Sequence, residues 1–128
     1  MTDHNKKKIL VVDDNKDILE LIKNGIEHLN MLYEVTAVSN GKECLNLLQS
    51  RYRPDIIFLD IMMPEMNGWE VFTKIKEHSS WNSIPIIFIS ARADPFSKGF
   101  GRIPAVDFIE KPFSISDLKR LIDKYVSV

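Results

Sequence analysis

The stretch "DIIFLDIMMPEMNG" (55–68) decides the fold of this chain. It begins with a continuous apolar run, which is typical of a strand covered on both faces, as in a parallel sheet. The run reaches a single carboxylate, Asp60, and the chain then turns through Pro64, Asn67 and Gly68. The stretch therefore predicts a buried strand with an acid at its carboxyl end, followed by a helix.

Similar apolar runs occur four more times, with amphipathic helical patterns between them. The segment 93–104 has two prolines and two glycines in twelve residues, so any helix there is short or irregular. The other predicted strands are 8–12, 33–38, 84–90 and 105–109, and the other predicted helices are 15–29, 40–49, 68–78 and 114–126.

Strand and helix thus alternate five times, which predicts an α/β fold, a doubly wound five-stranded parallel sheet with helices on both faces. The run 33–38 alternates apolar and polar side chains, so we expect it at an edge of the sheet. The 128 residues suit a single domain, residues 1–128, with an ordered core of about 7–127.

Composition and charge exclude several classes of protein. The net charge of −1 offers no general attraction to nucleic acid or to an anionic membrane. The one cysteine, Cys44, excludes an internal disulfide framework and a cysteine-built zinc site. No run approaches membrane-spanning length, and the N-terminus has too short an apolar stretch for a signal peptide. We therefore expect a cytoplasmic protein with no nucleic-acid or membrane partner.

Polar side chains stand at the ends of four predicted strands: Asp13 and Asp14, then Asp60, Ser90 and Lys111. Ligands bind outside the carboxyl ends of open parallel sheets, so we expect these five residues along one edge. Taken alone, each has an ordinary explanation, because an acid after a strand is often a turn former or a helix cap and a lysine is often a surface charge. The case for a site depends on the whole set.

Three carboxylates close together repel one another and need a cation. Oxygen ligands without histidine or cysteine favour a hard metal, and Mg²⁺ fits, with Mn²⁺ as a possible substitute. With Lys111, such a metal leaves positive charge facing one carboxylate oxygen, as the clamping of a phosphoryl group requires. Asp60 is the natural nucleophile, because aspartyl phosphates are known covalent intermediates.

Four motifs in this order resemble the receiver domain of two-component response regulators, of the chemotaxis-regulator type, over essentially the whole chain. They are "ILVVDDN" (9–15), "PDIIFLDIMMPEMNGWE" (54–70), "PIIFISA" (85–91) and "DFIEKPF" (107–113). Each motif is weak or moderate alone, but their combination is highly specific. The resemblance implies a flavodoxin-like (βα)5 fold with strand order 2-1-3-4-5.

The resemblance also implies roles for individual residues. Asp60 is the expected phosphoacceptor, and Lys111 pairs with it and then with a phosphoryl oxygen. Asp14 is the expected direct Mg²⁺ ligand, together with Asp60 and the backbone carbonyl of Met62, whereas Asp13 positions metal-bound water.

Further expectations concern switching. Ser90 matches the switch hydroxyl and Phe108 the switch aromatic, while the Lys111–Pro112 bond matches one that is typically cis in the family. Phosphorylation is then read on the surface of the fourth helix, the fifth strand and the fifth helix. The segment 93–104 lacks the usual alanine-rich fourth helix and Pro104-Ala105 replaces Gly-Ala, so this surface is expected to be unusual.

Two positions are expected to set the lifetime of the phosphoryl group. Met62 stands two residues after Asp60, and Arg92 stands two residues after Ser90. In the family these positions flank the path of an attacking water. We expect the bulky Met62 and the cationic Arg92 to hinder or redirect that water.

Other functions fit less well. A haloacid-dehalogenase-type phosphatase needs a second acid two residues after its nucleophile, where this chain has Met62. A flavodoxin-like FMN carrier needs a glycine- and hydroxyl-rich phosphate loop where this chain has the acidic sequence "DDNKD" (13–17). The remaining alternative is a non-phosphorylated pseudo-receiver that acts only as a protein-binding module, although such proteins normally lose part of the acid set.

The expected phosphoryl donor is another molecule, because none of the three histidines suggests a kinase. A histidine kinase or a histidine phosphotransfer protein is the predicted donor. We expect self-catalysed phosphorylation and dephosphorylation, and no enzyme that turns over a free substrate. A downstream protein target, or a fused output domain not present in this chain, would receive the signal.

Overall fold

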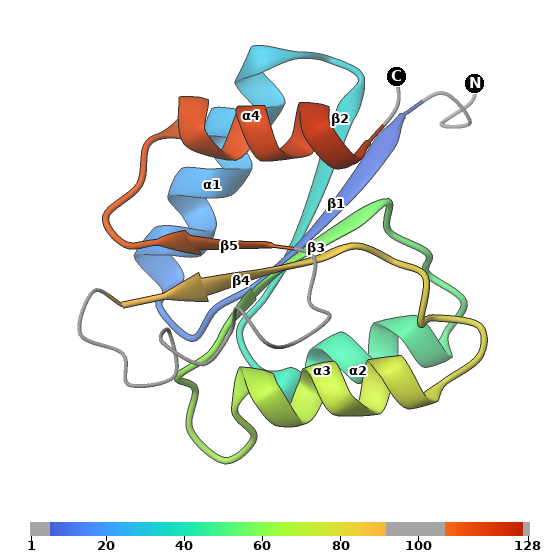
Figure 1. Ribbon diagram of the computed structural model, residues 1–128. Helices are drawn as coiled ribbons and strands as arrows, with labels where there is room; N and C mark the ends of the chain where they lie inside the picture. The colour runs from blue at the N-terminus through green and yellow to red at the C-terminus, as the bar shows by residue number, and fades with distance from the viewer. Residues whose placement is uncertain (1–5, 92–106, 127–128) are drawn as a thin grey trace.

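The computed structural model describes residues 6–91 and 107–126, and these contain five parallel strands and four helices (Figure 1). The strands lie side by side in the order β2-β1-β3-β4-β5. The predicted doubly wound, flavodoxin-like α/β fold and its strand order are confirmed. The strands are β1 (Lys7–Val12), β2 (Tyr33–Val38), β3 (Ile56–Asp60), β4 (Ile86–Ser90) and β5 (Asp107–Glu110), and the helices are α1 (Lys16–Leu29), α2 (Gly41–Gln49), α3 (Gly68–Glu77) and α4 (Ile115–Tyr125).

The element boundaries follow the sequence pattern closely. Each described helix begins and ends within one residue of its prediction. The strand predicted from residue 84 begins instead at Ile86, because Pro85 has no N–H to donate to a ladder. The strand predicted over 105–109 is β5, which runs on to Glu110. The expected fourth helix, 93–104, lies outside the described residues.

Helices cover both faces of the sheet, with α1 and α4 on one face and α2 and α3 on the other (Figure 1). Every residue of β3 is buried, and successive side chains enter opposite cores. Phe58 packs in the core with Ile22 and Leu118, whereas Leu59 packs in the core with Val71. Full burial of a side chain of this size contributes about 2–3 kcal/mol, so β3 anchors both layers.

The outer edge of β2 is covered by charged side chains from α1. Val35 points its backbone groups away from β1, and its N–H donates to Glu27 Oε2 at 2.9 Å. Its carbonyl accepts from Lys23 Nζ at 3.0 Å, and Lys23 and Glu27 are themselves paired at 3.1 Å. Both backbone groups at the middle of this edge strand therefore have partners.

Helices α2 and α3 begin with almost the same sequence, "NGKE" (40–43) and "NGWE" (67–70). In both, the asparagine is the N-cap, and its side-chain oxygen accepts from the glutamate N–H, at 2.8 Å in α2 and 2.9 Å in α3. The glycine is the first helical residue in both. Local sequence therefore starts the two helices in the same way.

Candidate functional site

The polar residues predicted at the strand ends do lie at one edge of the sheet. Asp13 follows β1, Asp60 and Ser90 end β3 and β4, and Lys111 follows β5. Asp13, Asp14 and Asp60 each offer a carboxylate oxygen, and these oxygens all lie within 4.8 Å of one another. Asp13 and Asp60 are buried, whereas Asp14 is exposed. The sheet therefore gathers three acids from two strand ends.

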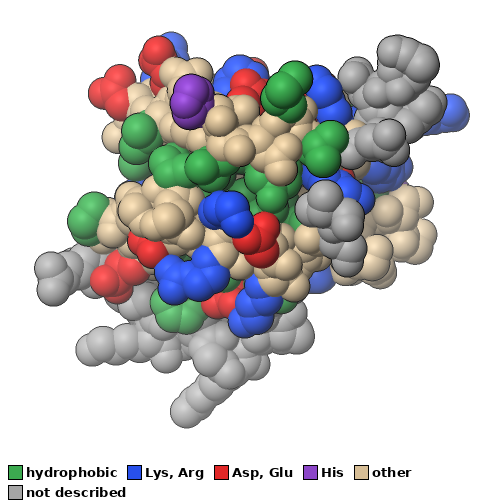
Figure 2. Space-filling view, turned by 90° about the horizontal axis from the view of Figure 1, so that it is seen from above, with side chains coloured by type: hydrophobic (Ala, Val, Ile, Leu, Met, Phe, Trp, Pro, Cys, Tyr) green, Lys and Arg blue, Asp and Glu red, His purple; other side chains and the backbone are tan. Residues whose placement is uncertain are grey.

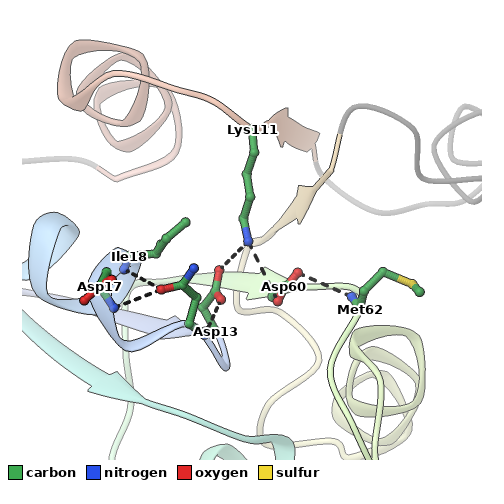
Figure 3. Close-up of polar contacts among 7 residues, drawn as sticks. Asp13, Asp17, Ile18, Asp60, Met62 and Lys111 are labelled. Atoms are coloured by element: carbon green, nitrogen blue, oxygen red, sulfur yellow. Dashed lines mark hydrogen bonds and ion pairs between the residues drawn. The ribbon is translucent and has the colours of Figure 1, made fainter.

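Lys111 extends from the end of β5 toward the two buried acids (Figure 3). Its Nζ lies 3.1 Å from Asp13 Oδ2 and 4.0 Å from Asp60 Oδ2. The Lys111 side chain is 25% exposed, so solvent still reaches the site from this side. The Lys111–Pro112 bond is cis, as expected.

The electrostatics of Asp60 are those of a crowded acid. Burial raises the pKa of Asp60, and the neighbouring charge of Asp13 raises it further, while Lys111 lowers it. The resulting pKa is about 8, far above the ordinary value of an aspartate. The single positive charge of Lys111 thus does not offset the negative charge of the three carboxylates. A donor set made only of oxygen atoms fits a hard divalent cation such as Mg²⁺.

The turn between β1 and α1 shows that the acids are not needed as caps. Asn15 is the N-cap of α1, and its side chain accepts from the N–H groups of Asp17 and Ile18. Asp13 holds this turn, because its Oδ1 accepts from the Asn15 N–H at 2.9 Å. Asn15, and not Asp14, therefore caps α1, so capping does not explain Asp14.

The loop from β3 to α3 carries Met62, whose N–H donates to Asp60 Oδ1 at 3.3 Å. The Met62 side chain is 54% exposed and points away from Asp60 (Figure 3). Further along, Glu65 has a φ of 67° and the Met66 N–H donates to the Pro64 carbonyl at 2.7 Å. This is a tight three-residue turn of the strained kind, which shortens the path back to α3.

At the end of this loop, Gly68 makes a contact with the end of β3 that the sequence analysis did not predict. The predicted helix was expected to begin at Gly68, and Gly68 is indeed the first residue of α3; it is buried, and its φ is not positive. Its N–H donates to the Ile61 carbonyl at 2.8 Å. The sequence itself carries no signal for this close contact, because Gly41 follows an asparagine N-cap in the same way.

The two expected switch residues differ in burial. Ser90 is fully buried, and its Oγ has no hydrogen-bond partner within residues 6–91 and 107–126. Phe108 is 44% exposed on β5. Arg92, expected to influence phosphoryl lifetime, lies outside the described residues, as does the Pro104-Ala105 pair.

Comparison with known proteins gives the family. The model of the response regulator receiver domain matches residues 9–123. The chain is 38% identical over 111 residues to the response regulator SaeR of Staphylococcus epidermidis, covering 86% of this chain and 46% of that protein. It is 35% identical over 127 residues to a probable cyclic di-GMP phosphodiesterase of Vibrio cholerae, covering 98% of this chain and 28% of the relative. The chain therefore spans less than half of either relative.

Solved structures agree with this match. A receiver domain of a histidine kinase from Syntrophus aciditrophicus superposes with a TM-score of 0.83 at 30% identity, covering 94% of this chain and 89% of that one. A receiver domain of a sensor histidine kinase from Pseudomonas aeruginosa, solved with magnesium in its active site cleft, has a TM-score of 0.82 at 25% identity, covering 94% and 97%. No helix in the described part of the chain is long and apolar enough to cross a membrane. The chain belongs to the response regulator receiver domain family of two-component systems.

Proposed function

We propose that the protein accepts a phosphoryl group on Asp60 from a histidine kinase or a histidine phosphotransfer protein. The observation that carries this proposal is the position of Asp60, buried between two other acids with Lys111 Nζ 4.0 Å from its Oδ2. A buried acid with a pKa of about 8 would be stabilised in its ionised, nucleophilic form by a bound cation. The related protein solved with magnesium in its cleft supports the same interpretation.

Asp13, Asp14, Asp60 and the Met62 carbonyl are the groups that would hold Mg²⁺, and Mn²⁺ would substitute. When bound, the metal offsets the charge of the acids and of the incoming phosphoryl oxygens. An Asp60 oxygen attacks phosphorus, the bond from phosphorus to the donor's imidazole nitrogen breaks, and the nitrogen keeps the electron pair. Lys111 moves its interaction from the Asp60 carboxylate to a phosphoryl oxygen.

The buried hydroxyl of Ser90 would donate to the new phosphoryl group. Phosphorylation adds about −1.5 to −2 charges, so it favours the arrangement in which Ser90 and Lys111 both bind the group. Phe108 on β5 would follow the movement of Ser90, and the surface of 93–104, β5 and α4 would carry the signal to a downstream partner. In this proposal the protein acts in the cytoplasm, without turnover of a free substrate.

The donor would dock beside Lys111, where an apolar groove of about 350 Å³ is lined by Ile18, Leu21, Pro112 and Phe113. Leu21 is 55% exposed and also borders a second groove, which runs between α1 and the start of α4. Figure 2 looks onto the side of the molecule that α1 and α4 cover and shows hydrophobic side chains between charged ones. A donor that must reach Asp60 passes directly over this surface.

Incubation with Mg²⁺ and acetyl phosphate, followed by intact mass measurement, tests the phosphorylation. Wild-type protein should gain the mass of one phosphoryl group, and Asp60→Asn should gain none. Lack of modification in the wild type would leave the pseudo-receiver as the better explanation, and equal modification of Asp60→Asn would show that Asp60 is not the phosphoacceptor. Comparing dephosphorylation of wild type, Met62→Asn and Arg92→Ala tests the lifetime proposal, which unchanged rates would refute.

The docking proposal has its own test. Leu21→Asp should slow phosphorylation by a histidine kinase at least tenfold and leave phosphorylation by acetyl phosphate unchanged. Met31→Asp is the matched control, because Met31 is 88% exposed in the turn that follows the other end of α1. Equal rates for both variants with the kinase would place the donor elsewhere.

A further inference from the structure

The start of α3 packs directly on the backbone of the proposed phosphoacceptor. Gly68 is buried, and a Cβ built on it would overlap the carbonyl oxygen of Asp60. The same Cβ would lie 2.9 Å from the Asp60 carbonyl carbon and 2.9 Å from Ile61 Cα. Carbon atoms pack at about 3.5–4.0 Å, so no side chain fits here without moving the backbone.

Gly41, the equivalent first residue of α2, has a different environment. A Cβ there would lie 2.5 Å from Val71 Cγ2 and 3.1 Å from Met66 Sδ. Those atoms belong to side chains, which adjust by rotation at modest cost, whereas the backbone at Asp60 is fixed by its strand. The two helices share a sequence pattern and a cap, but one of them requires a glycine against the backbone of β3.

Backbone conformation does not explain this requirement. Gly68 has no positive φ, whereas Glu65 in the same loop does, with a φ of 67°. The chain therefore accepts a non-glycine residue where the dihedral angle is unusual and has glycine where space is short. The space in question lies next to the carbonyl of Asp60.

We propose that Gly68 is a positioning residue for the metal and phosphoryl site. By seating α3 against Asp60 and hydrogen-bonding to Ile61, it fixes the loop that places the Asp60 carboxylate and the Met62 carbonyl. This inference rests on the proposed function, because it gives Gly68 a role in holding the proposed metal and phosphoryl site in place. Gly68 touches neither metal nor phosphoryl group, so its effect is indirect.

The test measures Mg²⁺ affinity, for example by calorimetry, on variants whose folding is verified by circular dichroism. Gly68→Ala should raise the Mg²⁺ dissociation constant at least tenfold, while Gly41→Ala should stay within about twofold of wild type. Phosphorylation of Gly68→Ala by acetyl phosphate should recover when Mg²⁺ is raised to saturation. Equal affinities for Gly68→Ala and wild type would overturn the inference.

A second measurement on the wild type covers the case in which Gly68→Ala does not fold. If opening of the Gly68 contact destroys the site, Mg²⁺ must slow hydrogen exchange at the Gly68 N–H, by about tenfold at ten times the dissociation constant. The His78 N–H, which donates to Ile75 at the other end of α3, should be less affected. Exchange at Gly68 that is insensitive to bound Mg²⁺ would also overturn the inference.

These outcomes are distinguishable from failure of the proposed function. If wild-type protein binds no Mg²⁺ and takes no phosphoryl group, the proposed function fails, and the role of Gly68 fails with it. If wild type does both and Gly68→Ala binds Mg²⁺ equally well, the role of Gly68 alone is wrong.

Discussion

Helices α2 and α3 start from nearly the same four residues, yet their first glycines have different neighbours. Both begin with an asparagine cap, a buried glycine and a glutamate whose N–H is capped. The glycine of α2 faces side chains of α3 and its loop, whereas the glycine of α3 faces the backbone of Asp60. The difference teaches that a local pattern specifies where a helix begins, while the tertiary fold decides what that beginning packs against.

The largest expected effect is on the stability of the two alanine variants. Gly68→Ala should destabilise the protein by about 3 kcal/mol, because the new methyl group would overlap the Asp60 carbonyl and only a movement of the backbone could relieve the overlap. Gly41→Ala should cost about 1 kcal/mol, because side-chain adjustment and the better helix propensity of alanine limit the loss. Urea unfolding of both variants checks this. Equal losses would mean that the two helix starts are equally constrained.

The two helix starts also differ because only α3 packs on an acid, Asp60. The variant Asp60→Asn replaces this acid with a neutral side chain. The pKa of Asp60 is raised to about 8 in the folded protein, above the value of about 3.9 in an unfolded chain. Folding therefore favours the protonated form, and metal-free stability is full below about pH 4 and falls as the pH rises toward about 8.

Metal-free Asp60→Asn should accordingly be markedly more stable than wild type near pH 8 and nearly equal to it near pH 4. Urea unfolding as a function of pH measures the difference. Added Mg²⁺ should reduce it, because the cation favours the ionised carboxylate. A difference that does not change with pH would show that Asp60 titrates normally.

The two caps give a smaller and more even effect. Asn40→Ala and Asn67→Ala should each cost about 1 kcal/mol, because each removes one accepted hydrogen bond at a helix start. Mg²⁺ affinity should fall only for Asn67→Ala, since its helix rests on Asp60. Thermal unfolding and calorimetry, run on the same preparations, separate the two effects. An affinity loss for Asn40→Ala would break the contrast.

The smallest effect is expected at the other end of α2. Arg51 follows the helix with a φ of 73°, a conformation that favours glycine. Arg51→Gly should therefore stabilise the protein by about 0.5 kcal/mol without changing Mg²⁺ affinity. Thermal unfolding is the measurement, and a loss of stability would show that the Arg51 side chain contributes more than its backbone costs.

Much of the fold was predictable because the relevant signals are local. The apolar runs of β3 and β4 indicate burial on both faces, and the spacing of apolar residues gives the helices within one residue. The clustering of Asp13, Asp14 and Asp60 followed from the rule that parallel strands end at one edge. The start of β4 was misplaced because Pro85 was included in the apolar run.

The supporting contacts were harder to predict, because they depend on three-dimensional neighbours. Nothing in the sequence "NGWE" says that the glycine will meet the Asp60 carbonyl, since "NGKE" differs from it at one position. Likewise, the choice of Asn15 over Asp14 as the cap of α1 depends on backbone geometry in the turn. The pKa of Asp60 needs the distances to Asp13 and Lys111, which only the folded chain supplies.

The Lys23–Glu27 pair on the edge of β2 has a consequence for aggregation. An incoming strand from another molecule would have to displace an ion pair and two hydrogen bonds before it reached Val35. This makes the middle of the β2 edge a poor template for amyloid-like growth. Because Lys23 is 45% exposed and Glu27 34%, concentrated salt weakens the barrier by screening their charges.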